Sequence, residues 1–401
     1  MTDLETPVVT PPRTGALRRA APALLGYAAV RALGLITLAV WSAANGKSAH
    51  TLLTARWDSL WYTRVAGLGY GYEVRLPNGD VHSNLAFFPL LPWLERLVSA
   101  LTPLSYADAG LLVGTLASLA AAWGIFAVAD HVYGRRAGVC AVLVWAVLPI
   151  GVVQSMAYSE SLFTALAAWS LYAVLTGRWL TAGTLAALAG LTRPVGAAVV
   201  AALWVAAITS FVRDTPTAPD TSYGRNRSAP HPDGAPAWRR ALGMLIAPLG
   251  AAGYVLWVGH RTGGGPLGYL DVQAGWGNGF DGGYAFARFV GDKFTSFPSA
   301  LAGVGLIVGV ALVVWLYVTC VRQGQPLPLL VYAGIVTALA LCASGYFGSK
   351  PRLLLPAFPL LLPLAVALSR LRTSRSALVL GGVAVASAVY GAFWLNGTGP
   401  P

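Results

Sequence analysis

Asp58 is the carboxylate whose neighbours in the sequence point most directly to chemistry. It lies in the segment RWDSLWY, residues 56–62, between two tryptophans and shortly after the first long apolar run. Trp and Tyr concentrate where a membrane meets water, and an acid at that depth stays hydrated enough to ionise. We therefore expect Asp58 to be able to act as a general base at a membrane surface. The same residue also fits a simple N-cap for a helix that begins at Ser59.

Further charged residues follow near the ends of later apolar runs. Glu160 comes two residues after Tyr158, Arg193 ends an apolar run, and Lys350 and Arg352 stand close together before another. Each also has an ordinary explanation, because an acid in a first helical turn complements the helix dipole and cations near helix ends reach toward headgroups. Two cations on the outer side of a membrane nevertheless favour an anionic partner such as a phosphate.

One or two carboxylates beside cations at a membrane surface suit sugar transfer from a lipid-linked phosphate. A carboxylate would take the proton from an acceptor hydroxyl, while the cations stabilise the departing lipid phosphate. No metal or other cofactor is required for this, although a divalent ion held by Asp58, Glu73 or Asp80 stays open. The candidate catalytic residues are Asp58 and Glu160, and the candidate residues for the donor phosphate or substrate are Arg56, Trp57, Tyr158, Arg193, Lys350 and Arg352.

The composition is that of a protein embedded in lipid. Of the 401 residues, 56% are hydrophobic and only 10% are charged, whereas a soluble domain carries about 25% charged residues. Repeated apolar runs of roughly 18 residues or more predict an all-α polytopic membrane protein. We expect about 11 transmembrane helices, near residues 24–41, 108–129, 139–157, 160–177, 179–193, 195–212, 241–259, 299–321, 326–346, 353–369 and 376–395.

Charge decides how the chain is oriented. If residues 86–104 crossed the membrane, the later arginine-rich segments would all lie outside, against the positive-inside rule. Pro89 and Pro92 interrupt that segment, and its polar residues share one helical arc, so we expect a helix lying in the interface. The resulting organisation is a disordered basic cytoplasmic tail (1–20) and a single transmembrane domain (21–401), with a first outside loop carrying interfacial helices (43–107), a flexible cytoplasmic loop (213–240) and an outside loop (260–297).

Several other functions are disfavoured. A net charge of +12 could indicate nucleic-acid binding, but arginine and lysine accumulate in the cytoplasmic loops of membrane proteins, so we expect a bilayer as partner and no nucleic acid. The three cysteines lie in apolar runs and the five histidines are scattered, without the spacing of a zinc site. The run GWGNG, residues 275–279, is only superficially similar to a phosphate-binding loop, and we expect a flexible outer loop there.

Two motifs resemble a known family. RWDSLWY at 56–62 followed by AFFPLLP at 86–92, and YSESLF at 158–163, are similar to the first two outside motifs of the GPI mannosyltransferase 2 (PIG-V) family. The resemblance is good over about residues 24–200. It implies a fold of the GT-C glycosyltransferase superfamily, with a polyprenyl-phosphate or dolichyl-phosphate sugar as donor and transfer with inversion. It also implies Asp58 as general base and Glu160 as a second acid.

The resemblance leaves the acceptor open. Where that family is expected to carry Arg-Ser-Asn-Gly, this chain has Arg193-Pro194-Val195-Gly196. The chain is compact with short loops, as in a prokaryotic relative, which implies a multi-pass protein of a prokaryotic cell membrane with its N-terminus in the cytoplasm. We expect a mannosyltransferase acting on a lipid, glycan or protein. The alternatives are a transporter or flippase of lipid-linked sugars, or a non-catalytic subunit of a glycosyltransferase complex.

Overall fold

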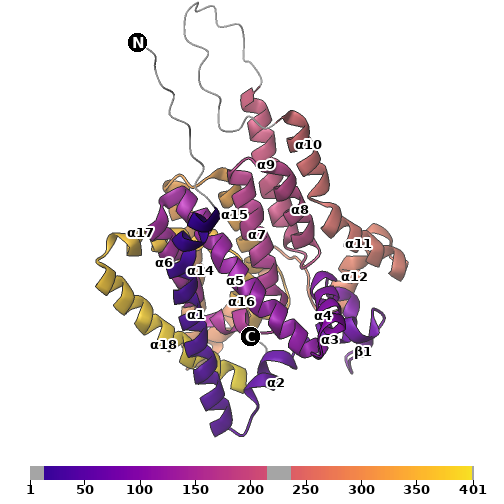
Figure 1. Cartoon of the computed structure of the whole chain (residues 1–401). Coiled ribbons are helices and arrows are strands. Elements are labelled where there is room, and N and C mark those ends of the chain that lie inside the picture. Colours follow the sequence, from indigo (N-terminus) through magenta and orange to yellow (C-terminus); the bar gives the residue numbers. More distant parts are fainter. Residues whose placement is uncertain (1–12, 215–235, 400–401) are drawn as a thin grey trace, which may run out of the picture.

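A computed structural model describes residues 13–214 and 236–399, and helices dominate it (Figure 1). The first half of the chain contributes α1 (Arg13–Ala44), α5 (Tyr106–Tyr133), α6 (Arg135–Ala146), η2 (Pro149–Ser155), α7 (Ser159–Leu175), α8 (Trp179–Gly190) and α9 (Gly196–Asp214). The second half contributes α10 (Ala237–Ile246), α11 (Leu249–Thr262), α14 (Ser299–Arg322), α15 (Leu327–Cys342), η5 (Phe347–Ser349), α16 (Lys350–Leu354), η6 (Phe358–Leu361), α17 (Leu362–Arg370) and α18 (Thr373–Asn396). The expected all-α membrane architecture is confirmed.

Six helical segments of the described chain are long and apolar enough to cross a bilayer, and there are up to eight if two bent pairs each count as one span. The pairs bend by 89° between α6 and η2 and by 75° between α16 and η6–α17. Three shorter apolar helices, α7, α8 and α15, complete the set. Each of the eleven expected ranges falls on one of these segments, and the number that crosses a bilayer stays a prediction.

The region expected to be the first outside loop is built from short elements. They are α2 (Ala49–Thr54), α3 (Asp58–Leu68), the antiparallel hairpin β1 (Glu73–Arg75) and β2 (Val81–Ser83), η1 (Asn84–Ala86) and α4 (Leu90–Leu101). With 12 residues α4 is too short to span a bilayer. It exposes Trp93, Leu97 and Leu101 and buries Glu95 against the protein. This arrangement suits an interfacial helix whose apolar face meets lipid.

The core lies where α5 and α7 pack on each other, with α6, α1 and α4 against α5. Small residues let these helices approach closely, which is how helices associate when lipid removes the usual hydrophobic driving force. A Cβ added at Gly124 of α5 would lie 2.9 Å from the Cβ of Ala168 on α7. At Gly250 of α11 an added Cβ would overlap the carbonyl oxygen of Ala187 on α8.

Basic residues from distant segments meet at one end of the bundle. Arg19 bonds Asp130 at 2.8 Å, and Arg135 donates to the carbonyl of Arg19 at 3.3 Å. Arg136 also donates to the carbonyl of Leu371, in the turn between α17 and α18. Three of the segments expected to be cytoplasmic, the start of α1, the α5–α6 turn and the α17–α18 turn, therefore lie together at one end. The compartment that this end faces stays a prediction.

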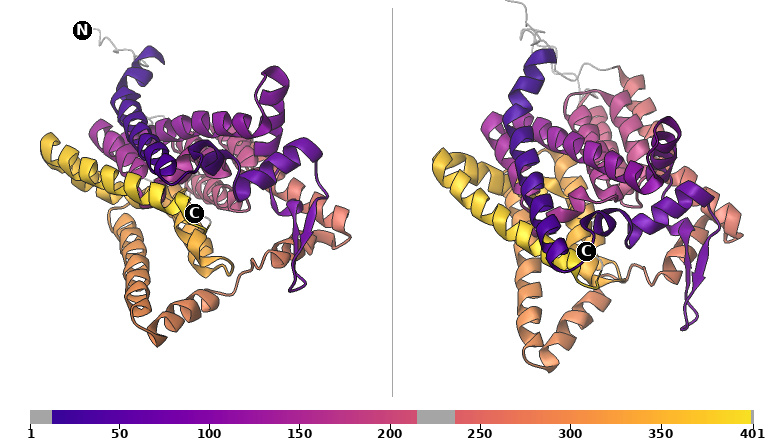
Figure 2. Two further views of the ribbon diagram at one scale, coloured as in Figure 1. Left: turned by 90° about the horizontal axis from the view of Figure 1, so that it is seen from below. Right: turned by 60° about the horizontal axis from the view of Figure 1, so that its bottom comes forward.

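Some expected boundaries change. Because α1 begins at Arg13, residues 13–20 are helical rather than disordered, and residues 1–12 lie outside the described residues. Most of the expected cytoplasmic loop, 215–235, also lies outside them, while its ends belong to α9 and α10. The expected outside loop 260–297 contains η3 (Gly265–Leu267), α12 (Gly268–Gly275), α13 (Tyr284–Asp292) and η4 (Lys293–Thr295). Figure 2 shows α13 and α14 projecting from the rest of the molecule.

Candidate active site

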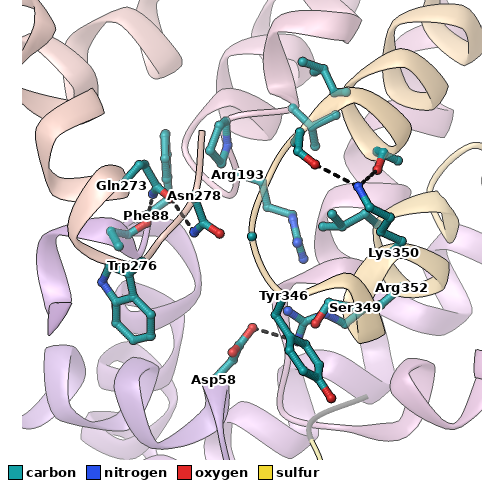
Figure 3. Close-up of a pocket in the computed structure, with 18 of the residues that line it drawn as sticks. Asp58, Phe88, Arg193, Gln273, Trp276, Asn278, Tyr346, Ser349, Lys350 and Arg352 are labelled. Carbon is teal, nitrogen blue, oxygen red and sulfur yellow. Dashed lines mark hydrogen bonds and ion pairs between the residues drawn. The ribbon is translucent and has the colours of Figure 1, made fainter. Parts of the chain in front are cut away.

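A cavity of about 450 Å³ opens between α3, the α8–α9 turn, α12, α15 and α16 (Figure 3). Its volume lies in the range of small-molecule sites. The charged residues among its lining are Asp58, Arg193, Lys350 and Arg352. A second part of the lining is aliphatic and comes from α15 and α16, including Val336, Leu339 and Leu353, and a third part is aromatic and amide-bearing. Ionic, aliphatic and aromatic surfaces therefore share one cavity.

The backbone before α3 directs Asp58 toward this cavity. Trp57, the residue that precedes the helix, has a φ of 52°. Among the described residues, no other non-glycine residue has a positive φ. Such a conformation is costly for a bulky side chain and persists only where its surroundings hold it. The guanidinium of Arg56 lies 4.0 Å from the Trp57 ring centre, and Arg56 itself donates to the carbonyl of Leu395 at 3.1 Å. Asp58 then sits in the first turn of α3, near the positive end of the helix dipole.

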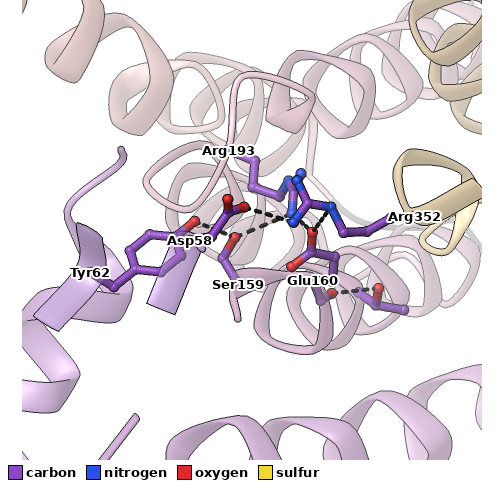
Figure 4. Close-up of polar contacts among 7 residues, drawn as sticks. Asp58, Tyr62, Ser159, Glu160, Arg193 and Arg352 are labelled. Carbon is purple, nitrogen blue, oxygen red and sulfur yellow. Dashed lines mark hydrogen bonds and ion pairs between the residues drawn. The ribbon is translucent and has the colours of Figure 1, made fainter. Parts of the chain in front are cut away.

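Two arginines and two carboxylates form one ion-paired network (Figure 4). Arg352 contacts Asp58 Oδ2 at 2.8 Å and Glu160 Oε1 at 3.2 Å, and Arg193 is ion-paired to the same Glu160 oxygen. Glu160 is 1% exposed, whereas the Asp58 side chain is 26% exposed. Glu160 is also absent from the cavity lining. The two acids therefore occupy different positions: Glu160 lies behind the arginines, and Asp58 faces the cavity.

Hydrogen bonds extend this network to α3. Arg193 Nη1 donates to Ser159 Oγ at 3.3 Å, and the Tyr62 hydroxyl lies 2.7 Å from the same oxygen. Burial raises the pKa of Tyr62, so its hydroxyl keeps its proton and can donate to Ser159. The start of α7, the α8–α9 turn, α3 and α16 are thereby fixed to one another by polar groups around the base of the cavity.

Lys350 reaches the cavity but is already engaged. Its Nζ donates to the carbonyls of Ala340 and Ala343 at 2.8 Å and lies 4.8 Å from the ring centre of Phe286. These carbonyls belong to the last turn of α15 and the residue after it, where helical C=O groups lack backbone donors. Lys350 thus caps α15. A phosphate that approached its ammonium group would also come close to the carbonyl oxygens that the group already binds.

Three of the expected substrate-binding residues lie away from the cavity lining. Arg56 binds carbonyls near the C-terminus of α18, Trp57 packs with the apolar residues beside α1 and α2, and Tyr158 is fully buried with Arg352 5.2 Å from its ring centre. From these positions the three residues can hold Asp58 and Arg352 in place, but they do not line the cavity where a ligand would bind. Glu73 and Asp80, which from the sequence alone are possible metal ligands, lie on or beside the β1–β2 hairpin, outside the cavity lining. In the part of the chain that is described, no three His, Cys, Asp or Glu side chains gather into a group that could hold a metal.

Sequence reasoning missed one side of the cavity. Phe87, Gln273, Trp276 and Asn278 line it, from the segment before α4, from α12 and from the loop after α12. Phe87 belongs to the AFFPLLP motif, and Trp276 and Asn278 belong to the GWGNG run. The alternation of glycines with an aromatic and an amide was the available signal, but nothing in the sequence shows that this run meets α3.

Comparisons with known proteins give a partial match in sequence. A family model described as dolichyl-phosphate-mannose-protein mannosyltransferase matches residues 84–218. This supports the GT-C part of the resemblance and does not single out the GPI mannosyltransferase 2 family. No curated protein matches the chain in sequence.

Among solved structures, ArnT from Cupriavidus metallidurans in the apo state is similar with a TM-score of 0.49 and 16% identity, over 91% of this chain and 62% of that one. ArnT of the same organism bound to undecaprenyl phosphate gives 0.48 and 16%, over 93% and 64%. The Archaeoglobus fulgidus oligosaccharyltransferase, in complex with Zn and sulfate, gives 0.46 and 14%, over 93% and 53%. The chain thus spans less than two thirds of the length of each of these structures.

Proposed function

We propose that this protein is an integral membrane glycosyltransferase that uses a polyprenyl-phosphate-linked sugar as donor. The observation that carries the proposal is the convergence of Asp58, Arg193 and Arg352 on a cavity with an aliphatic side formed by α15 and α16. The partial match to a dolichyl-phosphate-mannose-dependent family, together with the sequence resemblance, supports mannose as the sugar. The acceptor is a lipid, glycan or protein that carries a hydroxyl.

The chemistry follows from the charges. Asp58 Oδ2 is held by Arg352, while Oδ1 accepts no hydrogen bond from the described residues and is free to take a proton. The acceptor hydroxyl gives its proton to Asp58 as its oxygen forms a bond to the anomeric carbon of the sugar. The bond from that carbon to the phosphate oxygen breaks, and the electron pair leaves with the polyprenyl phosphate. Attack opposite the leaving group inverts the configuration of the anomeric carbon.

The arginines suit the leaving group. A phosphate that departs as a monoester carries more negative charge than the diester it came from, and preorganised guanidinium groups stabilise charge that develops in the transition state. Arg193 and Arg352 are 14% and 10% exposed, so water screens them weakly. The isoprenoid would lie along the aliphatic side of the cavity toward lipid.

The test is sugar transfer by purified protein in liposomes that contain a series of polyprenyl-phosphate sugars and native membrane lipids, with products identified by mass. Asp58→Asn should fold normally and lose about 10²- to 10⁴-fold in rate. Asp292→Asn, on exposed α13, is the matched control and should transfer at the wild-type rate. Full activity of the Asp58 variant would remove Asp58 as the base, and absence of transfer from every donor in the wild type would remove the enzyme itself.

A further inference from the structure

The loop after α12 is fixed in place rather than flexible. Gly275, the last residue of α12, lies so close to the hairpin that an added Cβ would stand 2.4 Å from the carbonyl oxygen of Val81. The Trp276 Nε1 donates to the carbonyl of Ser83 at 3.0 Å. Farther along, Ser344 N donates to the carbonyl of Gly279 at 2.8 Å. Contacts at both ends therefore hold the segment 275–279 across the cavity, contrary to the expectation from the sequence.

Aromatic rings fix the orientation of Trp276. His82 stacks on the indole at 4.1 Å with 9° between the planes, and Trp61 and Phe87 meet it at 4.8 Å and 5.4 Å in edge arrangements. His82 thus covers one face of the indole, and Trp276 and Phe87 both line the cavity. Aromatic pairs of this kind restrict ring motion and preorganise a surface.

Amide groups stand beside the rings. Gln273 Nε2 donates to the Tyr269 hydroxyl at 2.6 Å, and Gln273 Oε1 accepts from Asn278 Nδ2 at 2.9 Å. The Asn278 Oδ1 accepts no hydrogen bond from any described residue, and in Figure 3 the Asn278 side chain lies between Gln273 and Arg193. The four residues Phe87, Gln273, Trp276 and Asn278, here called the aromatic–amide wall, carry no charge.

We propose that the aromatic–amide wall is the subsite for the sugar ring of the donor. A pyranose has C–H groups that pack on an aromatic surface and hydroxyls that pair with amides, so both halves of the wall find a partner. An isoprenoid chain placed there would leave the amides of Gln273 and Asn278 beside hydrocarbon, which costs free energy. A phosphate there would lack the cations that the opposite side of the cavity supplies.

This assignment rests on the proposed function and orients the donor within one cavity. The phosphate meets Arg193 and Arg352, the isoprenoid meets the aliphatic side, and the sugar turns toward Trp276 and Asn278. The anomeric carbon is one bond from a phosphate oxygen, so it lies between the two sides, within the cavity that Asp58 also lines. The loop after α12 then discriminates the sugar, because a site that pairs with a hydroxyl rejects a ligand that lacks it.

The experiment compares two ligands that differ only in the sugar. Affinities of polyprenyl phosphate and of polyprenyl-phosphate mannose are measured without acceptor on purified protein in nanodiscs. Trp276→Ala and Asn278→Ala should each weaken the mannosylated ligand by about tenfold and leave the bare phosphate within about twofold. Trp315→Ala is the control, because Trp315 is exposed on α14, outside the cavity lining, and should change neither affinity. Thermal melting checks that the variants are folded, and Asn278→Ala still tests the wall if Trp276→Ala does not fold.

The outcomes separate the subsite from the enzyme. Equal weakening of both ligands, or weakening of neither, in a wild type that transfers sugar would overturn the subsite alone. In the liposome transfer assay of the same variants, a change confined to the KM of the acceptor would make the wall an acceptor site and would likewise overturn the proposal. A wild type that transfers no sugar from any donor would instead count against the proposed function.

Discussion

Replacement of Glu160 by glutamine distinguishes a positioning acid from a catalytic one. Glu160 is 1% exposed and serves as counterion to both Arg193 and Arg352. In Glu160→Gln, Arg352 keeps Asp58 at 2.8 Å, but Arg193 loses its carboxylate and is left with neutral acceptors, the hydroxyl of Ser159 at 3.3 Å and the oxygen of the new amide. One guanidinium, 14% exposed, is thus left in the protein without a carboxylate.

Removal of one partner of a buried ion pair costs about 3–5 kcal/mol. The lower end applies here, since Arg352 remains paired and Arg193 lines a cavity that water can enter. With an unfolding entropy of roughly 2.1 cal/mol/K per residue, a loss of about 3 kcal/mol in a chain of 401 residues lowers the melting temperature by about 4 °C. Asp58→Asn should lower it by less than about 1 °C, because the 26% exposed Asp58 side chain leaves its ion pair with Arg352 partly accessible to water.

The assay combines melting curves in detergent with transfer kinetics in liposomes. Glu160→Gln should raise the donor KM because Arg193 loses the carboxylate that orients it, whereas Asp58→Asn should lower kcat with little change in KM. Glu73→Gln, on the exposed edge of the hairpin, controls for loss of an acid. If Glu160→Gln melts with the wild type yet transfers nothing, Glu160 acts in the chemistry and the reasoning from burial is refuted.

Two other buried ionisable residues, Glu95 and Lys350, give further predictions. Burial raises the pKa of Glu95 well above 4.5, and neither carboxylate oxygen has a partner among the described residues. The folded state therefore holds a proton that the unfolded state releases as pH rises past its ordinary pKa, so the wild type loses stability upward from there. Glu95→Gln should raise the melting temperature, more at pH 8 than at pH 5, and an equal shift at both would contradict a buried neutral acid. Lys350→Met should lower the free energy of unfolding by about 1.5–3 kcal/mol through loss of the carbonyls it caps, while Lys293→Met, a half-buried lysine outside the cavity lining, should cost less in the same denaturation series.

Much of the architecture follows from local sequence. The apolar runs are long enough to require helices in lipid, and each expected range corresponds to one helical segment. The two prolines and the polar arc of residues 86–104 identified a short helix that does not span, as α4 has 12 residues. These features depend on residues near one another in the chain, where composition and periodicity carry the information.

The candidate site was predictable in part. Charge bias alone assigned Asp58, Glu160, Arg193, Lys350 and Arg352 to one side of the membrane, and the structure brings all five together. Their roles could not be separated beforehand, because Asp58 and Glu160 look alike in sequence: each lies in the first turn of a helix that begins directly after an aromatic residue. Burial against two arginines from α16 and the α8–α9 turn makes them different.

The sequence by itself determined three things: that the chain is embedded in a membrane, which residues form its helices, and which charged residues are available near the membrane surface. Tertiary structure alone decided that Glu160 lies behind the arginines, that Lys350 caps α15, and that a glycine-rich loop with a tryptophan faces Asp58 across a cavity. The physical reason is that helix formation in lipid is set by neighbouring residues, whereas the depth of a charge and the partner it meets depend on how separate helices pack.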